Sequence, residues 1–176
     1  MHSDVITVPK DRIKVFIGKK GETRKKLEEA LNIKLEIDVD KQEVKFYFEN
    51  PEDYLKIKNV LLAIARGFTP DEALELISDE NTLYIIDLKD WYGKNKKTMH
   101  RYKGRVIGEH GSSRKKIEEY TNTKIVVYGK TIGIIGKHED VMLAKEAIEM
   151  LLSGSKHSTV YNFLERKISE RNLRFS

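Results

Sequence analysis

The sequence predicts an α+β protein made of two tandem copies of one β-α-α-β-β-α unit, each with a three-stranded antiparallel sheet covered by helices on one face. The first observation is a repeat, because FIGKKGETRKKLEEALNIKLEI returns ninety residues later as VIGEHGSSRKKIEEYTNTKIVV. The second is strict alternation of apolar and charged residues after each repeat, which is typical of half-buried strands. The third is a set of helix-capping residues further along each copy. A duplication therefore divides the chain into domains at 1–80 and 81–176, each large enough for a modest core.

The elements of the first copy follow from its periodicity and its turn residues. They are expected as a strand at 5–8, a short helix at 10–17, the turn GKKG, a helix at 22–31, strands at 33–39 and 44–48, and a long helix opened by Asn50 and Pro51. A further helix is predicted after Thr69, because Thr69-Pro70-Asp71-Glu72 has the spacing of a capping box.

The second copy repeats this order with a shorter hairpin. In KIVVYGKTIGII, Gly129 and Lys130 suit a two-residue turn whose first position needs a positive φ. The glycine pair in GIIG at 133–136 lies in an apolar strand, so we interpret it as sheet packing. A long helix is expected at about 138–153, and Ser158 or Thr159 is expected to open an additional C-terminal helix.

Each copy carries a G-x-x-G turn between two helical segments, with Arg-Lys-Lys beginning three residues after its second glycine. Glycines at both ends admit a phosphate backbone, and the following helix offers free N–H groups and the positive end of its dipole. The alternative is a solvated helix face with pairs such as Arg24 with Glu28 and Arg114 with Glu118. Basic residues ahead of acidic ones are the less stable order in an isolated helix, because cations in the first turn oppose the helix dipole. The order therefore favours the anion-binding interpretation over the solvated helix face.

These motifs resemble KH domains of the eukaryotic, type I topology, whose G-x-x-G loop clamps about four single-stranded nucleotides. The resemblance implies apolar contacts to bases from Ile17, Leu35 and Ile37 in the first copy, and from equivalent residues in the second. It predicts an RNA site made in the second copy by Ile107, Gly108, Glu109, His110, Gly111, Arg114, Lys115, Ile125 and Val127, and in the first copy by Gly18, Lys19, Lys20, Gly21, Arg24 and Lys25.

A closer resemblance covers most of the chain. The paired domains, the basic residue after each glycine turn, TNTKIVV, IIGKHEDVMLAKEAI and SGSKHSTVYNFLERKI are similar to the partner-of-Nob family of small-subunit ribosome assembly factors, in an archaeal form. The resemblance implies binding of small-subunit rRNA near its 3′ end during ribosome maturation. It also implies the Nob endonuclease and a translation initiation factor subunit as protein partners.

Charge is unevenly distributed between the two copies. Residues 1–80 carry 14 Lys and Arg against 17 Asp and Glu, whereas residues 81–176 carry 19 against 11. A basic half attracts polyanions, so we expect the second copy to be the principal RNA clamp. Its basic run, expected as a loop at 93–105, adds six candidate phosphate contacts, which are Lys94, Lys96, Lys97, Arg101, Lys103 and Arg105. The alternatives are that this run only increases solubility, and that Trp91 and Tyr92 before it anchor the loop to the core instead of stacking on bases.

Composition argues against several other functions. The chain has no cysteine, and its five histidines show no metal-ligand spacing, so no metal site, cofactor or disulfide is expected. No nucleophile elbow, P-loop or paired catalytic carboxylates appear, so we expect a non-enzymatic protein. Without an apolar stretch long enough for a bilayer or a signal peptide, a cytoplasmic location is expected. The protein is also expected to be a monomer. The alternative function is a protein adaptor that recruits a nuclease or an initiation factor, with RNA contact secondary.

Overall fold

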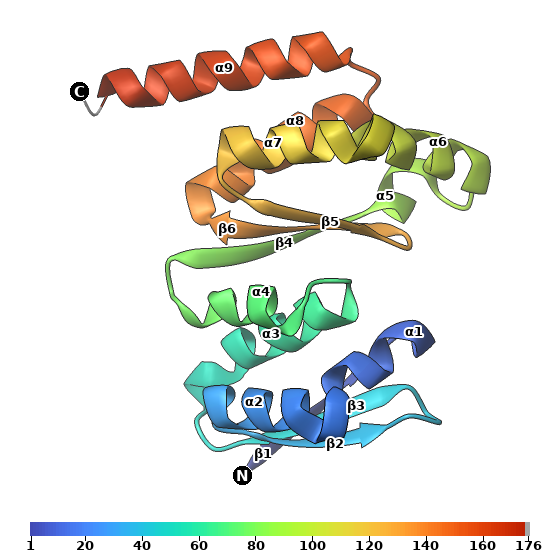
Figure 1. Ribbon diagram of the computed structural model, residues 1–176, viewed down its shortest axis with the longest axis vertical. Helices are drawn as coiled ribbons and strands as arrows, with labels where there is room; N and C mark the ends of the chain where they lie inside the picture. Colours follow the sequence, from blue (N-terminus) through green and yellow to red (C-terminus); the bar gives the residue numbers. More distant parts are fainter. Residues whose placement is uncertain (175–176) are drawn as a thin grey trace. The chain divides into compact units, whose positions relative to one another are not determined.

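The protein is described by a computed structural model in which residues 1–174 are placed, and the chain divides into two compact units at Asn81 and Thr82. Figure 1 shows a sheet and its own helices in each unit. In the first unit the elements are β1 (His2–Thr7), α1 (Lys10–Ile13), the 3₁₀ turns η1 (Lys14–Phe16) and η2 (Lys19–Gly21), α2 (Glu22–Leu31), β2 (Lys34–Asp38), β3 (Glu43–Phe48), η3 (Pro51–Asp53), α3 (Tyr54–Ala65), α4 (Pro70–Leu74) and η4 (Glu75–Ile77).

The first sheet has the order β1-β3-β2, and β3 pairs antiparallel with both neighbours. Its alternation is visible in β3, where Val44, Phe46 and Phe48 are buried and the residues between them are half-buried. The buried side faces the helices, which contribute Leu27 and other fully buried apolar residues to the core. Thr69 forms the predicted capping box with Glu72. Asn50, expected as a cap, makes no side-chain capping hydrogen bond, and Pro51 opens a 3₁₀ turn before α3 begins.

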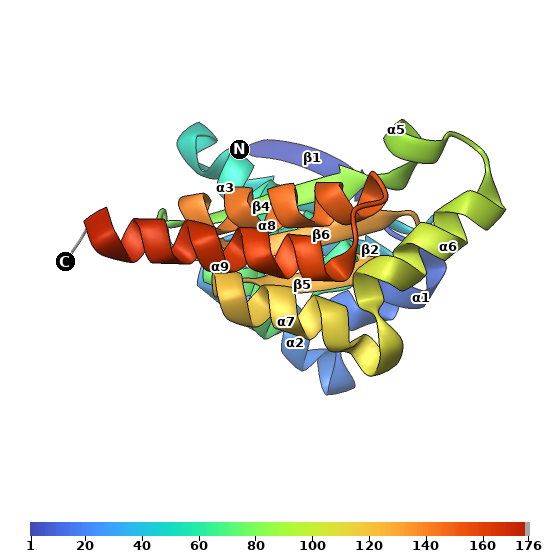
Figure 2. The ribbon, with the colours of Figure 1, turned by 90° about the horizontal axis from the view of Figure 1, so that it is seen from above.

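The second unit has the same order with an added segment. Its elements are β4 (Asn81–Asp87), α5 (Leu88–Tyr92), α6 (Lys96–Ile107), η5 (Glu109–Gly111), α7 (Ser112–Thr121), β5 (Lys124–Tyr128), β6 (Thr131–Lys137), α8 (His138–Leu152) and α9 (His157–Arg174). The strand order is β4-β6-β5, and α7 and α8 lie on one face of this sheet (Figure 1). Seen from above, α7, α8 and α9 run beside one another, in agreement with their mutual contacts (Figure 2).

The predicted fold class, two units of β-α-α-β-β-α with an additional helix each, is confirmed. Gly129 has the expected positive φ of 53° at the β5–β6 turn. Gly136 packs against the chain as expected for a sheet glycine, because a Cβ added there would lie 3.0 Å from Cγ2 of Thr123. The prediction that Ser158 or Thr159 precedes the last helix is wrong, since α9 already begins at His157.

The added segment is located by equivalent backbone hydrogen bonds. Val8 N donates to Gln42 O at 2.8 Å, and Leu88 N donates to Lys130 O at 2.8 Å, so the first strands end eighty residues apart. The glycine turns are ninety residues apart, so the second unit carries ten additional residues between its first strand and its glycine turn. These residues form α5, the turn at 93–95 and the start of α6. The expectation of a loop at 93–105 is therefore wrong, because most of this run is helical.

Candidate nucleic-acid interface

The two glycine turns have nearly the same backbone conformation. Their φ/ψ values are 71°/−178° at Gly18 and 75°/171° at Gly108, 56°/26° at Lys20 and 54°/29° at His110, and 74°/13° at Gly21 and 75°/11° at Gly111. A positive φ thus occurs at both glycines and at the residue before the second one, and only glycine adopts this region freely. The repeated sequence therefore encodes one specific turn twice.

The two glycines of each turn have different surroundings. A Cβ added at Gly108 would lie 2.6 Å from the backbone N of Ser113, and one added at Gly18 would overlap the Thr23 side chain. At Gly21 an added Cβ meets nothing within 4 Å, and at Gly111 its nearest neighbours are side-chain atoms at 3.7 Å or more. The first glycine therefore allows the turn to pack on the following helix, and the second leaves open space where a ligand can approach.

Cationic side chains adjoin the open side of the second turn. Nη2 of Arg114 lies 3.7 Å, and Cε of Lys115 3.8 Å, from the position of a Cβ at Gly111. The residues at the tip of this turn are almost fully exposed, with 90% of the Glu109 side chain and 92% of the His110 side chain accessible. Lys19 and Lys20 are exposed at the same place in the first turn. Both turns can thus meet a phosphate, but the second one carries a carboxylate at its tip.

The repeated RKK-x-EE segment has a structural role beside its cations. Glu118 pairs with Arg114, with Oε1 2.8 Å from Nη1, and its Oε2 accepts a hydrogen bond from Ile125 N at 2.8 Å. In the first unit Glu28 lies 3.7 Å from Nε of Arg24 and accepts from Leu35 N at 3.0 Å. Each glutamate therefore ties the helix after the glycine turn to the neighbouring edge strand. The helix-pair interpretation of the segment holds for Arg24 and Arg114, while Lys25 and Lys115 remain exposed.

The apolar residues predicted to contact bases differ in their accessibility. Leu35 and Ile125 are only 1% and 2% exposed, so their side chains belong to the cores and not to an RNA-facing surface. Half-buried side chains remain at Ile17 and Ile37 in the first unit, and at Ile107 and Val127 in the second.

The basic run of the second unit divides into two groups. Lys94, Lys96, Lys97 and Arg101 are exposed, and Lys103 is half-buried. Arg105 is used inside the domain, because its Nη1 donates to Leu151 O at 2.6 Å and its Nη2 donates to Ser155 O at 2.5 Å. Its guanidinium therefore satisfies one carbonyl at the end of α8 and one in the turn that follows, and the prediction that Arg105 contacts phosphate does not fit this position.

The helical nature of this run could have been recognised. Asn95 caps α6 by accepting a hydrogen bond from Thr98 N at 3.1 Å, and Met99, Tyr102 and Val106 follow at helical spacing on its inner side. At about 1.5 Å per residue, the 12 residues of α6 separate Lys96 from the glycine turn by about 18 Å.

Tyr92 anchors the added segment to the core. Its hydroxyl donates to Leu152 O at 2.7 Å, and its ring stacks on Tyr102 with centroids 5.0 Å apart. Burial, with a contribution from the neighbouring Tyr102, raises the pKa of Tyr92 to about 12. The anchoring interpretation therefore holds for Tyr92, whereas Trp91 is 36% exposed.

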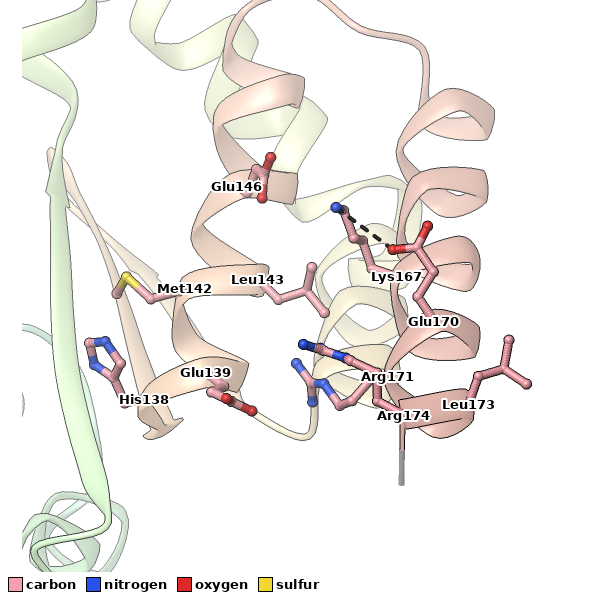
Figure 3. Close-up of a pocket in the computed structure, with 10 residues that line it drawn as sticks. All are labelled: His138, Glu139, Met142, Leu143, Glu146, Lys167, Glu170, Arg171, Leu173 and Arg174. Carbon is pink, nitrogen blue, oxygen red and sulfur yellow. Dashed lines mark ion pairs between the residues drawn. The ribbon is translucent and has the colours of Figure 1, made fainter. Parts of the chain in front are cut away.

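A separate cavity of about 670 Å³ lies between α8 and α9 (Figure 3). Acidic and basic residues line it together, and several of them form ion pairs. Nη1 of Arg171 lies 2.6 Å from Oδ1 of Asp140, and Nζ of Lys167 lies 4.0 Å from Oε2 of Glu170. This cavity therefore lacks the excess of positive charge that a phosphate site needs.

Among residues 1–174 no group of three or more His, Asp or Glu side chains is placed to hold a metal ion, and no helix there could span a membrane.

Comparison with known families assigns both halves of the chain. Residues 82–169 match the model for the second KH domain of PNO1, described as a eukaryotic-type KH domain of type I, and residues 3–79 match the general KH domain model. The KH domain-containing protein MJ0443 of Methanocaldococcus jannaschii is 46% identical over 93% of this chain and 73% of its own length. The pre-rRNA-processing protein PNO1 of Chaetomium thermophilum is 33% identical over 79% of this chain, and the chain spans about half the length of such eukaryotic relatives.

Solved structures agree over both units. A protein of unknown function from Aeropyrum pernix, APE0754, has a TM-score of 0.91 and 36% identity, covering 98% of this chain and 94% of its own. Dim2p from Pyrococcus horikoshii has a TM-score of 0.85 and 40% identity, covering 94% and 99%. A complex from the same organism, a/eIF2alpha-aDim2p-rRNA, contains a chain with a TM-score of 0.87 and 39% identity, covering 96% and 95%. This chain therefore belongs to the PNO1/Dim2 family of KH-domain proteins, which is the partner-of-Nob family that its sequence resembles.

Proposed function

We propose that this protein binds single-stranded RNA without catalysis, and that its target is small-subunit rRNA near the 3′ end during ribosome maturation. The observation that carries the proposal is the open side of the second glycine turn, where Gly111 leaves room for a phosphate beside Arg114 and Lys115. The pre-rRNA-processing names of the relatives and the rRNA in the Pyrococcus complex support the same function.

In this proposal the strand is held mainly through its backbone. Phosphates approach at 108–111 and at 18–21, where Lys19, Lys20 and Lys25 supply charge in the first unit. Bases contact the half-buried side chains of Ile107 and Val127, and Ile17 and Ile37 would act in the same way in the first unit. Such contacts give affinity that falls steeply with salt, and weak sequence discrimination from the phosphate contacts themselves.

The test is binding of a short single-stranded fragment from the 3′ end of small-subunit rRNA, measured by fluorescence anisotropy over a range of salt concentrations. Gly111→Asp places a carboxylate in the open space and is expected to weaken binding at least tenfold. Gly154→Asp is the matched control, because Gly154 also has a positive φ of 100° and open surroundings but lies in the turn after α8. Equal affinities of the wild type and Gly111→Asp would contradict the proposal.

A second candidate function is a protein adaptor. It is favoured by the initiation factor subunit that accompanies Dim2p and rRNA in the Pyrococcus complex. In this case the KH units would recruit that factor or the Nob endonuclease, and the protein itself would act as a monomer. Pull-down of either partner after ribonuclease treatment, from wild-type and Gly111→Asp protein alike, would support direct recruitment. Loss of both partners after ribonuclease treatment would show that RNA mediates the association.

A further inference from the structure

A second basic site lies in the second unit, away from the glycine turn. It is a cavity of about 400 Å³ formed by the turn between α5 and α6 and by the tip of the β5–β6 hairpin. We call it the lysine pocket, and its lining consists of Lys89, Gly93, Lys94, Lys96, Met99 and Lys130. Four of its six lining residues belong to the ten residues that the first unit lacks, and these four are Lys89, Gly93, Lys94 and Lys96.

The walls of the lysine pocket are held in place by specific bonds. Asp87 caps α5 by accepting from Lys89 N at 2.9 Å, and Asn95 caps α6. The hairpin tip is joined to α5 by the bond from Leu88 N to Lys130 O, and Tyr92 fixes the segment to the end of α8. Met99 is 5% exposed and lies in the second unit's core cluster. The cavity is therefore preformed and needs little reorganisation to accept a ligand.

The charge of the pocket is unbalanced. Four of its six lining residues are lysines and none is acidic. Within residues 1–174 the structure gives none of these four ammonium groups an ion pair. The wall of the cavity is mostly apolar, so the aliphatic stems of the exposed lysines and Met99 form it and the ammonium groups lie toward solvent at its mouth. Like charges around one opening repel each other, and an anion placed between them removes that repulsion.

The first unit provides a natural comparison. Its cavity between α1 and the β2–β3 hairpin occupies the corresponding place, since Gln42 and Lys130 accept equivalent backbone bonds. That cavity is lined by two lysines together with Asp11 and Asp40, so its charges balance. The excess of positive charge is therefore specific to the second unit, and three of the four lysines lie in its added segment.

We propose that the lysine pocket binds a backbone phosphate of the same RNA strand that the glycine turn holds. This inference rests on the proposed RNA binding and extends it. The pocket and the glycine turn lie at opposite ends of α6, about 18 Å apart along the helix. Lys97 and Arg101, one turn apart and both exposed, lie along α6 between them. The RNA footprint is then longer than the roughly four nucleotides that a single KH turn holds.

The experiment compares RNAs of different length on the same protein. One RNA has about four nucleotides, and two others have about twelve, extended from it on the 5′ or the 3′ side with an unstructured sequence. The variant is Lys94→Ala/Lys130→Ala, which removes two exposed ammonium groups. The matched control is Lys137→Ala/Lys167→Ala, which removes two exposed lysines of the same unit that do not line the pocket. Thermal unfolding of both variants checks that the fold is retained.

For the wild type, one of the two extended RNAs is expected to bind more tightly than the short one. The pocket variant should bind that RNA about tenfold more weakly, and the slope of log affinity against log salt should become shallower by about 0.7 for each phosphate that is no longer neutralised. It should bind the short RNA like the wild type, and the control variant should bind all three RNAs like the wild type.

Other outcomes separate this inference from the proposed function. If the pocket variant binds the short RNA and the extended RNAs more weakly by the same factor, the lysines act only through the overall electrostatic field and the pocket is not a subsite. If the pocket variant binds all three RNAs like the wild type while Gly111→Asp binds all three more weakly, the proposed RNA binding is supported and the inference that the pocket holds the strand is overturned. If the wild type binds no RNA, the proposed function fails and the lysine pocket loses its ligand with it.

Discussion

Gly108 and Gly111 share a φ of 75° but have opposite steric surroundings. Gly108 lies against the backbone of Ser113, and Gly111 faces open space. The same contrast holds between Gly18 and Gly21 in the first unit. Glycine can thus be required for packing at one end of a turn and for ligand access at the other, although the G-x-x-G motif has the same residue at both positions.

This contrast predicts different effects of alanine at the two positions. Gly111→Ala should lower the free energy of unfolding by about 1 kcal/mol, because only the unfavourable positive φ is added. Gly108→Ala should cost roughly 3 kcal/mol, since overlap with Ser113 adds to the same backbone strain. Gly104→Ala is the control in the interior of α6, where an added Cβ meets nothing, and it should stabilise the protein by roughly 0.5–1 kcal/mol. Denaturant unfolding measures the free energy of unfolding of the three variants. Equal decreases for Gly108→Ala and Gly111→Ala would contradict the different steric roles of the two glycines.

The order of basic and acidic residues in the hexapeptides RKKLEE and RKKIEE is explained by the contacts of their glutamates. The order of cations before acids lets Glu28 and Glu118 reach the backbone of the edge strand, while the cations stay near the glycine turn. Asn32 and Asn122 recur for a similar reason, because both end their helices in the left-handed conformation that asparagine tolerates well. Local backbone demands thus account for several of the residues that the two copies share.

At the scale of elements, the repeat and the alternation of apolar residues sufficed to predict the order of strands and helices along the chain, including the helix at Glu22–Leu31. The helix α5 and the start of α6 were not predicted, because the lysine-rich run was interpreted by its composition and not by the spacing of its few apolar residues. The burial of Leu35 and Ile125 was not predicted either. Alternation shows that a residue faces the helices, but it does not show whether the helices leave that side chain accessible.

Tyr92 predicts a measurable dependence of stability on pH. Its folded pKa of about 12 lies above the ordinary value of 10.0. Its contribution is therefore fully present below pH 10 and is lost as the pH rises through about 12. Tyr92→Phe removes the hydrogen bond to Leu152 O and should cost roughly 1 kcal/mol at neutral pH. Between pH 10 and 12 the stability of Tyr92→Phe should fall less than that of the wild type. Unfolding curves at several pH values measure the difference, and parallel declines would contradict it.

At the scale of the whole molecule, the duplication has produced two units with the same turn and different charge. Residues 1–80 have a net charge of −3 and residues 81–176 of +8. The turns themselves show the reverse difference, since Lys19 and Lys20 stand where the second unit has Glu109 and His110. Geometry does not distinguish the two turns, so electrostatics must decide which of them holds RNA more tightly. The larger net positive charge of the second unit favours the second.

The two units can be ranked directly with one substitution made at equivalent places. Gly21→Asp and Gly111→Asp add the same carboxylate in the same backbone conformation with open surroundings. We expect Gly111→Asp to weaken binding of the rRNA fragment at least tenfold, and Gly21→Asp to weaken it less, because the −3 unit holds polyanions more weakly. Glu109→Lys should do the opposite and strengthen binding severalfold, since its exposed carboxylate opposes the phosphate. Anisotropy titrations at two salt concentrations measure these effects, and a larger loss from Gly21→Asp would make the first unit the principal clamp.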